Sequence, residues 1–288
     1  MTTMEPSIAD VSDTSYWVAY YRAKESERPD AMFRDPLAKI LVGERGKRIA
    51  ESMADLGRHT EWAVISRTVI IDEFIQELIA EGVTAVLNIG AGLDTRPYRM
   101  NLPATLEWIE ADYPHIVAKK NELLANEKAV CRLTRVAVDL ADAEQRRKFL
   151  SASAPGAAKV LVITEGVMPY LGAEQVTDLA RDLLTQSRYA YWITEYFHPR
   201  VYRFLKASLR SQKMRNAPFR FYPADWFGFF ASLGWKKRDL RYSEQIAERF
   251  GRRSPMPWWG RVVLTFVPAK VRDEMKRMTG YTVLERAT

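Results

Sequence analysis

From Thr84 onward, short apolar runs alternate with longer segments whose apolar residues recur at helical spacing. The apolar runs cover residues 84–89, 105–112, 131–140, 159–166 and 189–196. The helical patterns between them cover residues 113–127, 141–151 and 173–186. Strands that alternate with amphipathic helices form right-handed βαβ units. The pattern therefore predicts a doubly wound α/β fold, with a mostly parallel sheet covered by helices on both faces.

The chain before Thr84 lacks this alternation, and its pattern predicts helices. Its clearest helix covers residues 61–80, which carry a continuous apolar stripe. We expect two parts, a helical N-terminal cap over residues 1–82 and an α/β core over residues 83–288.

Residues 197–222 are rich in Arg, Pro and aromatic residues and have no place in a minimal doubly wound core. We interpret them as an insertion after the fifth strand, on the substrate side. Beyond them we expect a helix near 223–233, a short strand at 235–241 and a last strand near 281–285.

The composition is that of a globular protein: 47% of the 288 residues are hydrophobic and 27% are charged. The single cysteine, Cys131, excludes an internal disulfide and favours a reducing compartment. The first residues show no signal-peptide pattern, and no apolar stretch is long enough to span a bilayer. We expect a cytoplasmic protein with no membrane partner.

The formal net charge is +7, from 43 Lys and Arg against 36 Asp and Glu. Such an excess could favour an acidic substrate or nucleic acid. Much of it lies in residues 206–220 and 236–253, where basic residues alternate with aromatic and apolar ones. This mixture is typical of a solvated surface. We therefore expect a small-molecule acceptor rather than nucleic acid.

The first candidate site is the turn NIGAGLDTR after the first predicted strand, which contains Gly90 and Gly92. Glycine lets a ligand touch the backbone, and ligands of open α/β sheets lie at the carboxyl ends of the strands. Dinucleotide sites use a similar turn but prefer Gly or Ala at the sixth position, where this chain has Thr95. For the glycines alone, a plain strand-to-helix turn is the alternative.

Asp112 closes the second predicted strand, 22 residues after Gly90. A carboxylate at this position can accept both ribose hydroxyls of a nucleoside. Charge-assisted hydrogen bonds of this kind contribute about 1.5–3 kcal/mol each. Glu110, on the same side of the strand, is the second candidate. A helix N-cap is the alternative role for Asp112, and the nearby glycines favour the ribose role.

Acidic residues close two further strands, Asp139 after RVAV and Glu165 after VLVIT. Asp139 is suited to accept from an adenine amino group while Leu140 packs on the ring, and Glu165 could pair with an ammonium group. Each acid could instead be a cap or loop residue. Three acids at three successive strand ends favour a shared ligand.

Arg67 lies on the apolar stripe of the helix predicted at 61–80, with Ile71, Phe74 and Leu78. Its side chain is therefore expected to point into the protein. A buried guanidinium requires an anionic partner because desolvation costs several kcal/mol per ion. The partner is either a protein carboxylate or the carboxylate of a ligand.

These groups together match S-adenosylmethionine, which combines adenosine with an ammonium and a carboxylate group. We predict this cofactor and no metal site. The predicted cofactor-binding residues are Arg67, Gly90, Gly92, Asp112, Asp139, Leu140 and Glu165.

Between Ser12 and Trp235 the chain carries the ordered motifs SDTSYWVAYYRAKES, SRTVIID, NIGAGLDTR, EADYP, AVDL and ITEGVMPYL. This set resembles the leucine carboxyl methyltransferase family, and within it the bacterial branch that includes tetracenomycin-type polyketide O-methyltransferases. The resemblance implies a Rossmann-like class I methyltransferase with a seven-stranded sheet, an antiparallel last strand and an added helical cap. It also implies S-adenosylmethionine at the positions given above. It does not fix the acceptor, because members methylate protein C-termini, small-molecule acids or a modified tRNA base.

Methyl transfer from a sulfonium is an in-line displacement, and alignment of the reacting atoms can lower the barrier by about 7–11 kcal/mol. A carboxylate acceptor is ionised at neutral pH, whereas a phenol with a pKa of about 10 benefits from a base. His198 follows the fifth strand and is the candidate base, with a surface or packed histidine as the alternative. We assign no role to His59 and His115.

Aromatic residues form one face of the first predicted helix. Such a stripe is ordinarily core packing. In the family, however, the N-terminal helices lie over the cofactor, so these residues are also candidates for an acceptor pocket. The candidate substrate-binding residues are Tyr16, Trp17, Tyr20, Tyr21, Tyr196 and Arg200.

We therefore expect an O-methyltransferase that acts on a carboxylate or phenolic hydroxyl of a small aromatic or polyketide-like molecule. A protein C-terminal carboxyl or tRNA-modifying methyltransferase is the first alternative, supported by the breadth of the family and the basic charge. A non-catalytic nucleoside-binding protein is the second.

Overall fold

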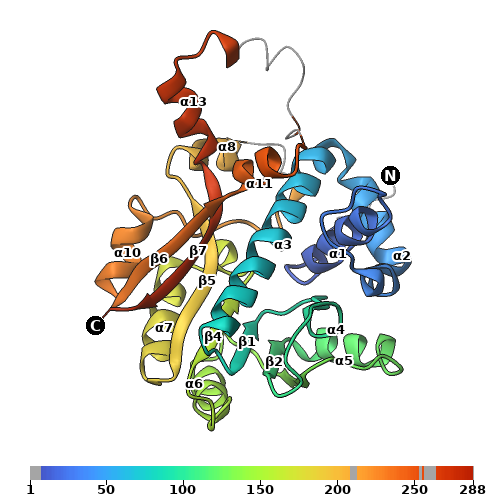
Figure 1. Ribbon diagram of the computed structural model, residues 1–288, viewed down its shortest axis with the longest axis vertical. Coiled ribbons are helices and arrows are strands. Elements are labelled where there is room, and N and C mark those ends of the chain that lie inside the picture. Colours follow the sequence, from blue (N-terminus) through green and yellow to red (C-terminus); the bar gives the residue numbers. More distant parts are fainter. Residues whose placement is uncertain (1–7, 208–212, 253–254, 256–263, 288) are drawn as a thin grey trace.

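The computed structural model describes residues 8–207, 213–252, 255 and 264–287. Seven strands form one sheet in the order β3-β2-β1-β4-β5-β7-β6 (Figure 1). The strands are β1 Ala85–Ile89, β2 Glu107–Asp112, β3 Arg132–Ala137, β4 Val160–Thr164, β5 Tyr189–Phe197, β6 Trp235–Tyr242 and β7 Thr279–Arg286. The first five strands are parallel, and β7 is antiparallel to both of its neighbours. The predicted doubly wound sheet with an antiparallel last strand is confirmed.

Helices cover both faces of the sheet. One face carries α3 (Gly57–Ala80) and α11 (Ser243–Arg249), and the other carries α6 (Ala143–Ala152), α7 (Ala173–Leu184) and α10 (Trp226–Ser232). Every residue of β1 and β4 is buried, since these central strands are covered on both sides. Successive side chains of β1 alternate between the two layers: Val86 packs with α3, and Leu87 packs on the opposite face.

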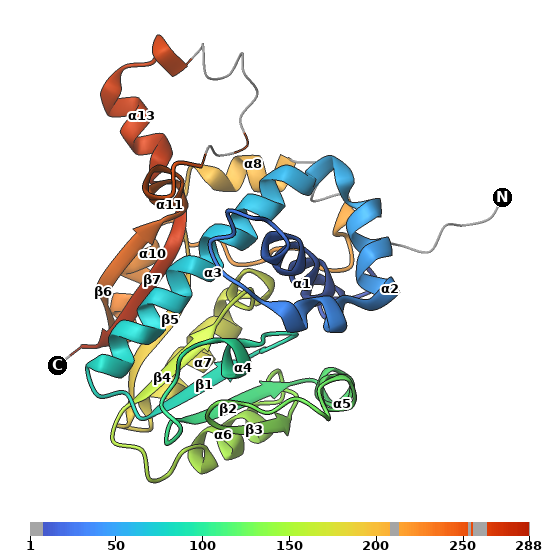
Figure 2. The same ribbon diagram turned by 45° about the vertical axis from the view of Figure 1, so that its right-hand side comes forward.

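The segment before β1 contains α1 (Asp13–Ser26), α2 (Pro36–Ser52), the short η1 (Ala54–Leu56) and α3. Helices α1 and α2 pack against each other beside the first turns of α3 (Figure 2). The later turns of α3 lie on the sheet, where Ile71, Phe74 and Leu78 are buried as the stripe predicted. Helix α3 therefore belongs both to the N-terminal helices and to the layer that covers the sheet.

The chain after β5 forms α8 (Val201–Ala207) and returns to the N-terminal helices. Met214 and Ala217 share an apolar cluster with Trp17 of α1, and Phe221 packs on Trp226 of α10. Residues 214–217, part of the predicted insertion, thus lie beside α1; residues 208–212 of that insertion lie outside the described residues. The other helices in the described residues are α4 (Arg96–Arg99), α5 (Pro114–Leu123), η2 (Met168–Tyr170) and α13 (Ala269–Lys276). In the part of the chain that the structure describes, no helix is both long and apolar enough to cross a bilayer.

Candidate functional site

A cavity of about 410 Å³ lies between the strand ends and the N-terminal helices. This volume is within the range of about 300–1,000 Å³ that is usual for ligand pockets. One side, the strand-end wall, is formed by some of the residues in each of the segments 88–94, 112–116, 138–141 and 165–167. The other side, the helical wall, is formed by some of the residues in each of the segments 11–22, 60–67, 170–179 and 216–220.

The glycine turn after β1 has the backbone that its sequence predicted. Gly90 and Gly92 both have positive φ, +66° and +48°, which L side chains rarely adopt. A Cβ on Gly92 would lie 2.9 Å from the Cβ of Ser15 in α1, and one on Gly90 would lie 2.5 Å from Val167 Cγ2. The two glycines therefore let the turn, α1 and the segment after β4 approach closely around the cavity.

Asp112 lines the cavity at the end of β2. One carboxylate oxygen accepts a hydrogen bond from the Gly92 N–H at 2.6 Å, and the other accepts from the Tyr113 N–H at 2.7 Å. Burial raises the pKa of Asp112, although both backbone donors oppose this shift. The second candidate, Glu110, is not part of the cavity lining; its carboxylate lies 2.8 Å from Lys120 Nζ and from Arg135 Nε.

An apolar part of the strand-end wall follows β3. Val138 and Leu140 line the cavity there, opposite Ile116 of α5. Asp139 is not among the lining residues; its carboxylate accepts a hydrogen bond from the Ala141 N–H at 2.9 Å. Leu140 therefore lines the cavity as predicted, whereas the Asp139 side chain is hydrogen-bonded within its own loop.

Arg67 and Glu165 meet in the cavity. The Arg67 Nε lies 2.8 Å from one Glu165 oxygen, and Arg96 Nη1 lies 2.7 Å from the other. Burial opposes ionisation of Glu165, but the guanidinium groups of Arg96 and Arg67 outweigh it and lower the pKa of this carboxyl. Of the two partners predicted for Arg67, the structure shows the protein carboxylate.

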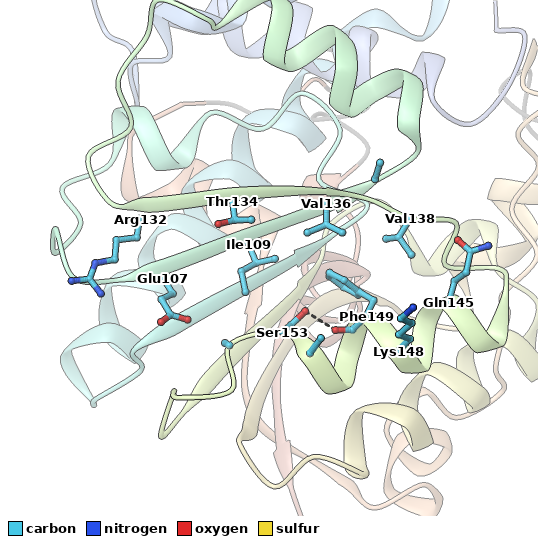
Figure 3. A pocket seen from close by; sticks show the side chains of 13 residues that line it. Glu107, Ile109, Arg132, Thr134, Val136, Val138, Gln145, Lys148, Phe149 and Ser153 are labelled. Atoms are coloured by element: carbon cyan, nitrogen blue, oxygen red, sulfur yellow. Dashed lines mark hydrogen bonds between the residues drawn. The ribbon is translucent and has the colours of Figure 1, made fainter.

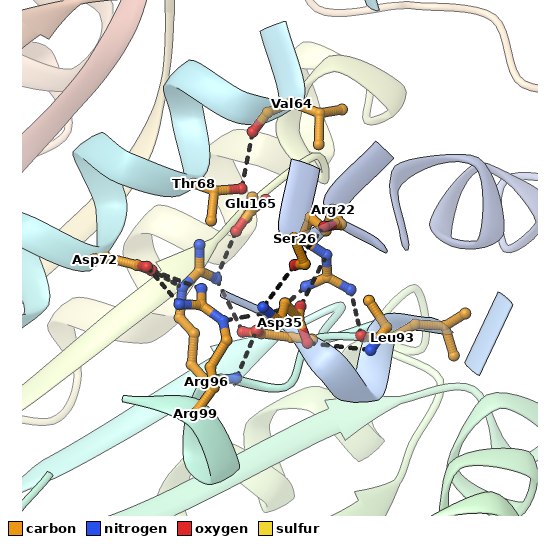
Figure 4. A network of polar contacts seen from close by, with 12 residues as sticks. Arg22, Ser26, Asp35, Val64, Thr68, Asp72, Leu93, Arg96, Arg99 and Glu165 are labelled. Carbon is orange, nitrogen blue, oxygen red and sulfur yellow. Dashed lines mark hydrogen bonds and ion pairs between the residues drawn. The ribbon is translucent and has the colours of Figure 1, made fainter. Parts of the chain in front are cut away.

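Arg96 is the centre of a buried ion-pair network that we had not predicted (Figure 4). It lies 2.9 Å from Asp94 and 2.6 Å from Asp72 of α3, and its side chain is 1% exposed. The guanidinium groups of Arg96 and Arg22 hold the pKa of Asp94 far below its usual range despite burial. The residues of the network are Arg22, Asp35, Asp72, Asp94, Arg96, Arg99 and Glu165.

This network connects three parts of the fold. Arg22 of α1 lies 3.5 Å from Asp35 and 3.6 Å from Asp94, and it donates to the Leu93 carbonyl. Helix α1 therefore contacts the glycine turn through ionic and hydrogen-bonding interactions of Arg22 as well as through packing of Ser15. The spacing of Asp94 and Arg96 in GLDTR was the available signal, because an acid and an arginine two residues apart follow the glycines directly.

On the helical wall, only one of the predicted acceptor residues lines the cavity: Trp17. Tyr16, Tyr20 and Tyr21 pack in the apolar clusters between α1, α2 and α3. The other predicted residues lie beyond β5. Tyr196 stacks on Phe227 at 5.2 Å, Arg200 lies 2.5 Å from Glu274 of α13, and His198 Nδ1 accepts from the Arg200 N–H at 3.2 Å.

The structure therefore does not bring Tyr196, His198 and Arg200 to this cavity. Other residues of the helical wall were missed by sequence reasoning. Thr60, Tyr170 and Arg220 line the cavity from three separate segments. The Arg220 backbone N–H donates to the Pro169 carbonyl at 2.6 Å, which fixes this segment beside η2.

A second hollow, of about 690 Å³, lies under α6 at the edge of the sheet (Figure 3). Ile109, Val136 and Phe149 form its apolar part, with Glu107 and Lys148 also in its lining. It contains none of the predicted site residues. The candidate site is therefore the smaller cavity at the strand ends.

The comparisons with known proteins agree with this fold. A family model described as leucine carboxyl methyltransferase matches residues 15–184, more than half of the chain. A Frankia alni protein named "Putative S-adenosyl-L-methionine-dependent methyltransferase" is 33% identical over 185 residues, which cover 61% of this chain and 64% of that protein. A Mycobacteroides abscessus protein of the same name is 32% identical over 188 residues, 61% of each chain. The matched region thus spans less than two thirds of these relatives.

Two solved structures share the fold. A DUF574 family protein from Streptomyces avermitilis has a TM-score of 0.59 and 14% identity, covering 93% of this chain and 96% of that one. A Thermobifida fusca protein described as a "putative methyltransferase" has a TM-score of 0.54 and 11% identity, covering 94% of both chains. At this identity the likeness concerns the fold alone. The match over residues 15–184 is the stronger evidence, and by it the chain belongs to the leucine carboxyl methyltransferase family.

Proposed function

We propose that this protein is an S-adenosylmethionine-dependent O-methyltransferase that acts on a small acidic molecule. The observation that carries the proposal is the cavity at the strand ends, where the glycine turn and the Asp112 carboxylate lie with the ion pair between Glu165 and Arg67 of α3. The relatives named as S-adenosylmethionine-dependent methyltransferases support the same cofactor.

The donor set of the cavity fits this cofactor. Asp112 would accept from the ribose hydroxyls, since among the described residues its half-buried carboxylate accepts from two backbone N–H groups and keeps capacity for more. Leu140 and Val138 would pack on the adenine. Glu165 would receive the ammonium, and Arg67 the carboxylate, of the amino-acid moiety. A Cβ at Gly92 would narrow the turn against α1, so glycine keeps this space open.

The bound cofactor supplies an electrophilic methyl group on a sulfonium. The protein's part is to hold the acceptor oxygen in line with that group and to exclude water. Trp17, Val64 and Tyr170 give the helical wall large apolar surfaces suited to this exclusion. A carboxylate oxygen is already ionised at neutral pH, so alignment alone suffices for that acceptor.

Arg220 supports an acidic acceptor. Three other arginines of the cavity lining, Arg22, Arg67 and Arg146, each form an ion pair with a protein carboxylate. Among the described residues, no ion pair is formed by Arg220, which is exposed beside Tyr170 and Pro218. An apolar wall with one such cation suits a small apolar or aromatic molecule that carries an anionic group.

Binding and turnover test the proposal separately. Calorimetric titration should show binding of S-adenosylmethionine and S-adenosylhomocysteine and none of NAD. Incubation with isotope-labelled methyl donor and a panel of aromatic and aliphatic carboxylic acids should label an acid as its methyl ester. Binding of NAD in place of the sulfonium cofactor would overturn the cofactor assignment. Labelling of peptides or tRNA but of no small acid or phenol would overturn the acceptor class.

A further inference from the structure

Arg146 lines the cavity without belonging to either of its walls, and the proposed function so far gives it no role. It lies near the start of α6, the helix that follows the strand-end segment 138–141. Gln145, Lys148 and Phe149 of the same helix line the second hollow (Figure 3). Of the described residues of α6, only Arg146 lines the candidate site, where it is 5% exposed.

The Arg146 guanidinium connects α7 to the loop between β3 and α6. Its Nε lies 2.7 Å from Asp182 Oδ2 of α7, and its Nη1 donates to the Leu140 carbonyl at 3.1 Å. A guanidinium is planar, and its donors point in fixed directions. The ion pair with Asp182 therefore orients the group so that Nη1 meets the loop.

The loop has few other contacts that hold Leu140. The Asp139 carboxylate accepts from the Ala141 N–H at 2.9 Å, and the Asp139 carbonyl accepts from the Asp142 N–H at 3.2 Å. Both bonds lie within the loop. In the described part of the chain, no backbone N–H donates to the Leu140 carbonyl. Arg146 is thus the donor that fixes this carbonyl relative to the helices.

Arg188 contacts the other end of α6 in a similar way. It donates to the carbonyls of Leu150, Ser151 and Ser153. Arg188 does not line the cavity, and neither do the three residues whose carbonyls it binds. Both arginines stabilise the attachment of α6, but only Arg146 holds a residue that faces the candidate site.

We propose that Arg146 is a positioning residue for the adenine of S-adenosylmethionine. It holds the Leu140 carbonyl, and with it the side chain that packs on the ring, while Asp182 orients the guanidinium. This inference rests on the proposed function, which places the adenine on Leu140 and Val138. It extends the cofactor site to α7, because Asp182 lies outside the cavity lining.

The experiment is calorimetric titration of the full chain with S-adenosylhomocysteine and with 5′-methylthioadenosine, which carries the same adenosine but no amino-acid moiety. Arg146→Gln removes the charge and shortens the side chain, so the Leu140 carbonyl loses its donor. Both ligands should bind about tenfold more weakly, the lower end of what a hydrogen bond to a charged group contributes. The two factors should be equal, because the ligands share the adenine.

Two further variants separate orientation from charge. Arg146→Lys keeps the charge, but its single nitrogen cannot contact Asp182 and the Leu140 carbonyl as a guanidinium does, so its loss should match that of Arg146→Gln. Asp182→Ala should weaken both ligands about threefold, because the guanidinium loses the partner that orients it. Asp182→Asn keeps an oxygen that accepts from Nε and should recover most of that loss.

Arg188→Gln is the matched control. It removes a half-buried arginine from the opposite end of α6 and should lower the melting temperature while both ligand affinities stay at the wild-type value. Thermal unfolding of every variant shows that affinities are compared between folded proteins. If Arg146→Gln does not fold, the comparison of Asp182→Ala with Asp182→Asn decides, since Asp182 is 13% exposed and outside the cavity.

Wild-type affinity in folded Arg146→Gln would overturn the inference, and so would equal affinities in Asp182→Ala and Asp182→Asn. A loss for S-adenosylhomocysteine but none for 5′-methylthioadenosine would place the effect of Arg146 at the amino-acid end and also overturn it. If neither ligand binds the wild type, the proposed function itself fails. Binding by the wild type without these differences leaves that function intact and removes only the role of Arg146.

Discussion

The strand-end wall and the helical wall of the cavity are assembled from the chain in different ways. The strand-end wall consists of four short segments, each of which directly follows a strand of the parallel sheet. The carboxyl ends of such strands lie at one edge, so a polar side chain there is placed by the strand before it. The helical wall combines residues 11–22, 60–67, 170–179 and 216–220, which tertiary packing brings together.

This difference separates two functions. The strand-end wall presents carboxylates and an open glycine turn, which suit the proposed cofactor. The helical wall presents aromatic surface and the Arg220 guanidinium, which suit a variable acceptor. Substitutions in the first wall, and at Arg67 of the helical wall, should therefore change cofactor affinity, whereas substitutions elsewhere in the helical wall should change only the use of the acceptor.

The largest expected effect concerns the junction of the two walls. Arg96→Ala should lower the free energy of unfolding by about 3–5 kcal/mol, because three carboxylates lose a buried partner. Urea denaturation followed by circular dichroism measures this change. Arg238→Ala, which removes a partly exposed arginine paired with Glu81 and Glu285, should cost about 1 kcal/mol or less. Equal stabilities of the two variants would contradict a stabilising role for the network.

A smaller effect is expected within the strand-end wall. Asp112→Ala should weaken S-adenosylmethionine and S-adenosylhomocysteine alike by about 2 kcal/mol, roughly 30-fold, since both ligands carry the same ribose. Calorimetry gives both affinities. Asp142→Ala removes only the N-cap of α6 and should leave them unchanged. Full affinity in Asp112→Ala together with a loss in Glu110→Ala would move the ribose site to Glu110.

On the helical wall, Arg220→Gln should raise the KM for a carboxylate acceptor about fivefold, as is usual for an exposed charge pair. Its affinity for S-adenosylhomocysteine should equal that of the wild type, which distinguishes an acceptor contact from a cofactor contact. Arg215→Gln is the matched control, because Arg215 is exposed on the same segment but does not line the cavity. A lower cofactor affinity in Arg220→Gln would contradict the separation of the two walls.

The smallest effect is expected outside the cavity. His198→Ala should leave the methylation rate of a carboxylate nearly intact, because this acceptor needs no base and the His198 Nδ1 is engaged by the Arg200 N–H. The rate should also be flat from about pH 6 to 8 once cofactor is saturating. If the acceptor is instead a phenol that uses His198, the rate should fall roughly 10²-fold.

Sequence reasoning worked best where a local pattern determines a position. The strand rhythm gave the sheet, and residues at strand ends such as Gly90, Asp112 and Glu165 line one cavity, as their spacing predicted. The inward direction of Arg67 followed from helical periodicity in the same way. In each case the geometry of one element is enough to place the side chain.

On the acceptor side, local patterns did not determine which side chains reach the cavity. In β5, Tyr196 was chosen from the sequence, but it packs with Trp226 and Phe227 on one face of the sheet. Its neighbour Glu195 points to the other face, toward Arg67. The motif ITE occurs at the ends of both β4 and β5, so Glu165 and Glu195 follow residues that are paired in the sheet.

The sequence by itself thus determined the fold, the strand-end wall and the family of this protein. Only the tertiary structure decided that Glu165 is the partner of Arg67, that Arg96 connects the cap to the sheet, and that Arg220 rather than Arg200 lines the cavity. The physical reason is the separation along the chain of the residues that interact. Hydrophobic periodicity and turn geometry act within one element, whereas an ion pair or a cavity wall depends on segments that meet only after the elements have packed.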